Sequence, residues 1–239
     1  MAIARNSLTS GSSDTDATSY ATASITPTAS RLLIACYHSV NLTEGIDPTQ
    51  PTLTGNGLTW TVVDSWVYRQ FGDRYRLSVA AANTGGSPST GTITFDHGAQ
   101  TEEGASWSVF ELNGTDVSNG VSQCFPQFVH STLNAGGTSI SLTLASAADS
   151  GNRPFLCMGG GMNEDITPRT NWTEIHQAGA TSPNVLIETQ ERLDTFETTA
   201  SATWTTAILY GGIAFEVKIA GAAGGGATDP FGMSGFFGG

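Results

Sequence analysis

Four histidines are the first residues to test for metal or acid–base chemistry. His38, His97, His130 and His176 lie in four separate segments, and none has the His-x-x-x-His or Cys-x-x-Cys spacing that zinc sites use. A zinc site would need these segments to converge by chance in the folded chain. We therefore predict no metal site at these residues.

Two acidic regions could supply oxygen ligands to calcium. Asp96-His97 and Glu102-Glu103 flank one predicted strand end, and Asn163-Glu164-Asp165 follows three glycines. Calcium takes about 6 to 8 oxygen ligands, and neither region has the spacing of a calcium-binding loop. We interpret both as solvated acidic loops.

The chain has no signature of nucleophilic or glycosidic catalysis. Two glycosidase carboxylates lie roughly 5 to 9.5 Å apart, and with 21 Asp and Glu residues some pair will meet that separation by chance. The Gly-x-Ser-x-Gly motif of hydrolases is missing. Glu111 and Glu216, which follow Phe110 and Phe215, are interpreted as outward-facing solubilising residues. We predict that the protein is not an enzyme and binds no cofactor.

Aromatic residues gather near one predicted hairpin, where they could stack on sugar rings. They are Trp60, Trp66, Tyr68 and Phe71. Core packing is the stronger interpretation for Trp60, because a matching Trp172 occurs in the second half of the chain. We expect Trp66 and Tyr68 to share its strand face and to be buried.

The last residues of the chain place Phe231, Met233, Phe236 and Phe237 between glycines. Aromatic side chains spaced in this way cannot build a core of their own, and burying each one stabilises a complex by about 1.5–3 kcal/mol. We predict that these four residues form an assembly contact with a partner.

Two motifs occur twice in the same order, which indicates an internal repeat. Trp60-Thr61-Val62-Val63 returns as Trp172-Thr173-Glu174-Ile175, and Val109-Phe110-Glu111-Leu112 returns as Ala214-Phe215-Glu216-Val217. The repeat predicts two similar sets of strands. Because neither set could cover its own faces, we expect a single antiparallel, jelly-roll-like β-sandwich built from both.

Strand-like segments separated by turn residues support this class. In the first half they are residues 23–26, 32–37, 59–67, 76–81, 92–95 and 107–112; in the second, 139–144, 155–158, 172–176, 185–190, 202–205 and 213–219. We predict an extended N-terminal arm (1–20), a sandwich (21–219) with pseudo-repeats at about 22–113 and 138–219, and a Gly-rich tail (220–239). Two small domains joined by residues 113–134 are the alternative.

Composition limits the classes of partner. The chain has 9 Lys and Arg against 21 Asp and Glu, a net charge of −12, so it lacks the cationic surface that nucleic acids and anionic membranes require. No window approaches the roughly 20 apolar residues that span a bilayer. We predict no nucleic-acid and no membrane partner, and the amino terminus lacks the pattern of a secretory signal.

The three cysteines are odd in number and widely spaced, which argues against a disulfide framework. Cys36 and Cys157 lie in apolar runs, where a small buried thiol is the simpler interpretation, and Cys124 lies in the segment between the halves. We expect reduced cysteines, with a bridge between Cys36 and Cys157 as the alternative.

Several runs of the chain form a further pattern. They are Ala23 to Ala29 leading into Arg31-Leu32-Leu33-Ile34, then Gly57-Leu58-Thr59-Trp60-Thr61, Gly91-Thr92-Ile93-Thr94-Phe95 before Trp107 and Phe110-Glu111-Leu112, and the closing Ile213-Ala214-Phe215-Glu216-Val217. Together they resemble the jelly-roll modules of bacteriophage structural proteins and some bacterial surface proteins. The resemblance extends over about residues 15–219, and these motifs are specific for fold more than for function.

The resemblance implies a structural protein of the phage virion, made in the host cytoplasm. We expect a capsid decoration or cement protein whose partners are the major capsid protein or other virion subunits. A homo-oligomer is expected, and a trimer would fit the local three-fold sites of a capsid. A tail-associated adhesin or carbohydrate-binding module is the first alternative, and a depolymerising glycosidase or lyase is the second.

Overall fold

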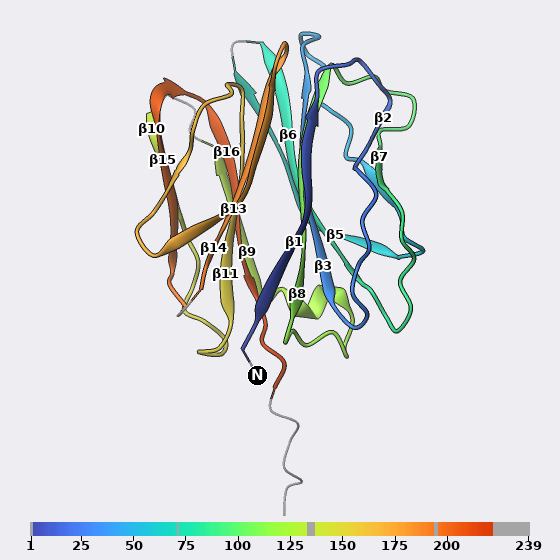
Figure 1. Cartoon of the computed structure of the whole chain (residues 1–239). Coiled ribbons are helices and arrows are strands. Elements are labelled where there is room, and N and C mark those ends of the chain that lie inside the picture. The colour runs from blue at the N-terminus through green and yellow to red at the C-terminus, as the bar shows by residue number, and fades with distance from the viewer. Residues whose placement is uncertain (1, 71, 133–136, 194–195, 222–239) are drawn as a thin grey trace, which may run out of the picture.

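The computed structural model describes residues 2–70, 72–132, 137–193 and 196–221. These residues form sixteen β-strands in four antiparallel sheets, together with one short 3-10 helix, η1 (Val121–Cys124) (Figure 1). The predicted all-β class and β-sandwich are confirmed. In the part of the chain that the structure describes, no helix has the length and apolar character needed to cross a membrane.

Strands β1 to β8 form the first half of the molecule. Inner sheet 1 has the order β1 (Ala4–Ser13), β8 (Gly104–Asn113), β3 (Leu32–Asn41), β6 (Asp73–Asn83) and β5 (Trp60–Gln70). Outer sheet 1 has the order β2 (Ser19–Ala21), β7 (Ile93–Asp96) and β4 (Thr52–Gly55). A hydrophobic cluster that includes Leu33, Phe95 and Val109 joins the two sheets.

Strands β9 to β16 repeat this arrangement in the second half. Inner sheet 2 has the order β9 (Gln127–Thr132), β16 (Tyr210–Val217), β11 (Arg153–Gly160), β14 (Asn184–Arg192) and β13 (Trp172–Thr181). Outer sheet 2 has the order β10 (Gly137–Thr143), β15 (Thr199–Ile208) and β12 (Thr167–Pro168). Each strand of the first half therefore has a counterpart eight strands later.

Each half has the strand alternation of a jelly roll, with strands 1, 8, 3 and 6 in one sheet and strands 2, 7 and 4 in the other. The fifth strand departs from that pattern in both halves. It pairs with the sixth strand as a hairpin, β5 with β6 and β13 with β14, and so widens the inner sheet. The jelly-roll-like character expected from the sequence is thus present twice.

The two inner sheets pack face to face and form the predicted sandwich, and an outer sheet covers each of them (Figure 1). The central core contains Phe110 from the first half and Phe155 and Phe215 from the second. Phe155 stacks on both, with ring centroids 5.6 Å and 5.3 Å apart. Because both faces of an inner sheet are covered, its middle strands are buried along almost their whole length, as β3 and β16 are.

The contacts between the inner sheets occur twice, with the halves exchanged. Strand β1 lies against β13 and β8 against β14, while β9 lies against β5 and β16 against β6. Since β1 corresponds to β9 and β5 to β13, this reciprocity is that of an isologous, two-fold interface. The internal repeat is therefore a repeat of packing as well as of strand order.

Matching bulges interrupt the two hairpin edge strands. The register of β5 shifts between Val62 and Asp64, and that of β13 shifts at the equivalent place, between Glu174 and His176. A bulge bends an edge strand and blocks its pairing with another sheet. It also changes which residues share a face. Trp60 packs on the cluster between inner sheet 1 and outer sheet 1, whereas Trp66 and Tyr68 pack on the central core between the inner sheets. The expectation that the three share one face was wrong.

The N-terminal segment is part of the sandwich rather than an arm. Residues Ala4–Ser13 of the predicted arm 1–20 form β1, the edge strand that pairs with β8. The segment between the halves is likewise structured, because it contains η1 and β9, which pairs with β16. Of the predicted tail 220–239, residues 222–239 lie outside the described residues.

Candidate functional site

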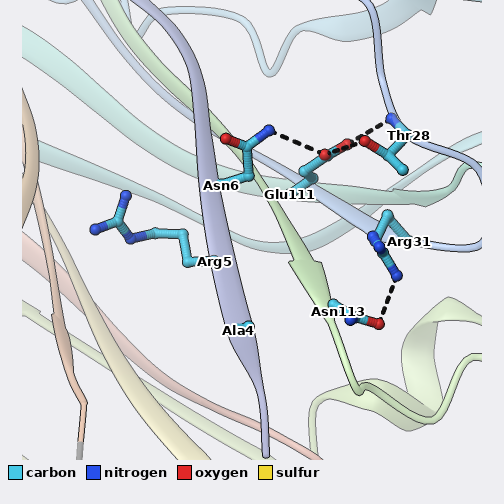
Figure 2. Close-up of a pocket in the computed structure, with 7 residues that line it drawn as sticks. All are labelled: Ala4, Arg5, Asn6, Thr28, Arg31, Glu111 and Asn113. Carbon is cyan, nitrogen blue, oxygen red and sulfur yellow. Dashed lines mark hydrogen bonds between the residues drawn. The ribbon is translucent and has the colours of Figure 1, made fainter.

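A polar pocket of about 300 Å³ opens beside β1 and β8 at the end of inner sheet 1 (Figure 2). The carboxylate of Glu111 lies at its centre and is 2% exposed. It accepts hydrogen bonds from Thr28 N (2.7 Å), Thr28 Oγ1 (2.6 Å) and Asn6 Nδ2 (3.1 Å). The remaining lining residues are Ala4, Arg5, Arg31 and Asn113.

The same arrangement recurs in the second half around Glu216, which is fully buried. Its carboxylate accepts hydrogen bonds from Ala148 N (3.1 Å) and from the side chains of Asn152 and Gln127. Gln127 is the first residue of β9, and the strand register makes it the counterpart of Asn6 on β1. Both glutamates therefore attach the first strand of a half, and the loop before its third strand, to its last strand.

The interpretation of Glu111 and Glu216 as outward-facing residues was wrong. Alternation along their strands suggested a solvated face, but the inner sheets are covered on both sides and have no such face. A buried carboxylate is costly unless donors surround it, and each of these has three. Their recurrence beside Phe110 and Phe215 marks a structural attachment point.

A second polar cluster connects His97 and Glu102, both in the β7–β8 loop, to Tyr37 of β3. His97 Nδ1 donates to Thr49 O (2.8 Å), so Nε2 accepts the hydrogen bond from the Tyr37 hydroxyl (2.7 Å). Glu102 accepts from Thr49 N (3.0 Å) and lies 3.5 Å from His97 Nδ1. The interpretation of this region as a solvated loop was wrong for His97 and Glu102, which are buried. Asn163 and Asp165, in the other acidic loop, are exposed.

Burial changes the proton affinity of this cluster. It raises the pKa of Glu102 to about 7, and it lowers the pKa of His97. His97 is therefore neutral near neutral pH, and Glu102 gains or loses its proton in that range. Across residues 2–70, 72–132, 137–193 and 196–221, no three His, Cys, Asp or Glu side chains are placed to hold a metal ion together.

Replacing Glu102 by glutamine is expected to weaken the dependence of stability on pH. The folded-state pKa of Glu102 lies above the value of 4.5 for an unperturbed carboxyl, so the folded state binds the proton more tightly. Its contribution to stability is complete below pH 4.5 and is lost as the pH rises through about 7. Glutamine cannot ionise, so the free energy of unfolding should fall less between pH 5 and pH 8 in the variant than in the wild type. Guanidinium denaturation of both proteins at the two pH values tests this. The same decrease in both proteins would contradict the prediction.

One serine and one histidine meet at the distance of a nucleophile and its base. Ser108 Oγ on β8 lies 2.9 Å from His176 Nδ1 on β13 and 2.8 Å from Thr189 Oγ1 on β14. This pair could not be predicted from the sequence, because the two residues are 68 positions apart and belong to different halves. Ser108 is fully buried between the inner sheets, where a substrate could reach it only by opening the sandwich. The pair joins the halves.

The aromatic residues of the β5–β6 hairpin lie mostly inside the molecule. Tyr68 is buried, as expected, and shares a 2.7 Å hydrogen bond with His38 Nε2. Trp66 was also expected to be buried but is half-buried, and it stacks on His130 with ring centroids 4.0 Å apart. His130 in turn binds Asp64 (2.8 Å), which joins the edge strands β9 and β5. Trp60 is half-buried, and Phe71 lies outside the described residues.

The two ends of the described chain lie beside each other. A Cβ placed on Gly114 would lie 2.5 Å from the carbonyl oxygen of Ala2, and Gly114 O accepts a hydrogen bond from Ala220 N (2.8 Å). Figure 1 shows both ends at the same end of the sandwich. The predicted contact residues Phe231, Met233, Phe236 and Phe237 follow Gly221 in the sequence and lie outside the described residues.

A scan against protein-family models and searches of curated proteins and of solved structures found no match to the chain.

Proposed function

We propose that the chain is a structural protein of a bacteriophage virion, and more narrowly a decoration or cement protein that binds the assembled capsid. The observation that supports this most directly is that the first and last described residues lie together at one end of a duplicated jelly-roll-like body. Jelly rolls serve in viral capsids, although lectins and enzymes use them as well.

The interior of the body favours a structural role over a catalytic one. Glu111, Glu216 and the His97–Glu102 cluster are buried, and the protein's own amide, hydroxyl and backbone groups bind them. These networks hold loops and strands in place. The partners we propose are the major capsid protein or other virion subunits, reached from the end of the body where residues 222–239 begin, and several copies are expected to act together.

Removal of residues 222–239 is expected to weaken particle binding at least tenfold while leaving the melting temperature of the body unchanged. The four aromatic or thioether side chains of that segment offer apolar area that a partner groove can bury, at about 1.5–3 kcal/mol each. Capsids of the encoding phage, freed of the native protein, would be mixed with full-length or truncated chain, pelleted and assayed for bound protein. The matched control replaces the same four residues by serine in the full-length chain.

If the full-length and truncated chains pellet with capsids in equal amounts, residues 222–239 have no role in binding. If the full-length chain does not pellet with capsids at all, the proposed decoration function is wrong. Micromolar binding of the protein to a defined saccharide on a glycan array would favour the alternative, a tail-associated adhesin. Label on the tail rather than the head in electron micrographs would point to the same alternative.

A further inference from the structure

Two of the three cysteines occupy equivalent positions in the two halves. Cys36 lies on β3, between Ser108 of β8 and Val79 of β6. Cys157 lies on β11, between Ile213 of β16 and Thr189 of β14. Because β3 and β11 are the middle strands of the two inner sheets, the two-fold relation of the halves places these cysteines opposite each other.

Both thiols lie in the central core. Both residues are 0% exposed and belong to the same hydrophobic cluster, and the Cys36 thiol is near enough to raise the pKa of Cys157. Both cysteines are free in this structure, as is Cys124. Cys124 is separate from the pair, because its Sγ lies 3.0 Å from Asp116 O beside η1.

Glycine leaves room between the inner sheets beside the two cysteines. Gly159 lies two residues after Cys157, and His38 lies two residues after Cys36. A Cβ on Gly159 would lie 2.5 Å from the ring of His38, so the glycine makes space for that ring between β3 and β11. Facing sheets are usually about 10 Å apart, whereas a disulfide needs Cα atoms about 4.4–6.8 Å apart. Bond formation therefore requires the two middle strands to draw together at the cysteines.

We propose that Cys36 and Cys157 are an oxidisable pair that forms a disulfide across the two-fold axis and joins the two inner sheets covalently. With oxidised glutathione as the oxidant, a thiolate of the pair attacks its sulfur–sulfur bond and releases one glutathione. The second thiol then attacks the mixed disulfide and releases another. The pair loses two protons and two electrons, and one glutathione disulfide becomes two thiols.

The bond is expected to form during folding rather than after it. Burial raises the pKa of Cys157 well above its usual value, and the neighbouring Cys36 thiol raises it further. The thiolate that exchange requires is therefore scarce in the folded protein, and glutathione cannot reach it. A refolding chain exposes both thiols until the inner sheets close.

Refolding of the full chain from guanidinium in oxidised and reduced glutathione tests the proposal. The expected product has lost two hydrogen atoms in its intact mass and has one thiol that alkylates after denaturation, Cys124. A digest should contain one cross-linked peptide pair that joins Cys36 to Cys157. The oxidised protein should melt about 5–10 °C above the same protein in dithiothreitol, because the bond closes a long loop.

The Cys124→Ala variant is the matched control, and it should form the same bond with no free thiol left. A cross-link that uses Cys124 in the wild-type chain would overturn the proposal. Three alkylated thiols in a protein that has refolded to its native melting temperature would overturn it as well, since access of the oxidant is then not limiting.

Discussion

The Phe155→Ala variant is expected to have a free energy of unfolding about 3–5 kcal/mol lower than that of the wild type. Both halves of the chain should still unfold in a single transition. Phe155 is 1% exposed and stacks on Phe110 from the first half and on Phe215 from the second. Alanine would leave a cavity at the interface of the inner sheets, and the two halves share that interface.

Tryptophan fluorescence in a urea titration can test this separately for each half. Trp107 reports on the first half, and Trp172 and Trp204 report on the second. Replacing the tryptophans of one half by phenylalanine leaves a protein whose fluorescence reports on the other half alone. In the Phe155→Ala variant, the urea midpoints measured with the two reporter proteins should fall by the same amount. The matched control is Phe128→Ala, whose ring is 48% exposed on the edge strand β9 and should cost less than about 1 kcal/mol. Separate transitions for the two reporters would show that the halves are independent domains.

The Arg153→Met variant is expected to lose about 3–5 kcal/mol of stability, because it leaves a buried carboxylate with half of its cationic partners. Glu191 on β14 is fully buried and binds Arg153 (3.1 Å) and Arg5 of β1. The two arginines come from different inner sheets, so the ion pair also joins the halves. Methionine keeps most of the side-chain volume, so the loss reports on the ion pair and on the hydrogen bonds that Arg153 donates to Ile3 O and Leu193 O, rather than on a cavity.

Arg169→Met is the matched control for that variant. Arg169 also binds a glutamate, Glu197, but its side chain is 39% exposed, and solvent screens such a pair to about 1 kcal/mol or less. Chemical denaturation of both variants gives the comparison. Equal losses would show that burial of Glu191 contributes nothing, and the double variant Arg153→Met with Glu191→Met should recover part of the stability.

The duplicated architecture could be predicted from the sequence because its strongest signals are local. Trp60 and Trp172 begin equivalent strands, and the Phe110-Glu111 and Phe215-Glu216 pairs lie near the ends of equivalent strands. Turn residues separated most of the strands correctly. Strand β1 escaped prediction because its Ser- and Thr-rich sequence has few apolar anchors, and the backbone pairing with β8 holds it in the sheet.

The polar sites could not be predicted because they depend on contacts between distant segments. Ser108 meets His176 and Arg5 meets Glu191 only after the inner sheets have packed. Alternation suggested that Glu111 and Glu216 face solvent, a rule that holds for a sheet with one free face. In a molecule of four layers, the middle layers have no such face.

The reciprocal packing of the inner sheets has a consequence for where neighbours can bind. The surface that two copies of one half would use to dimerise is occupied inside a single polypeptide, so its formation does not depend on protein concentration. Because the two copies share a chain, their sequences are free to differ, as His38 and Gly159 do at equivalent positions. Any larger complex must therefore be built from the outer sheets, the strand edges or the ends of the molecule, and it can be asymmetric.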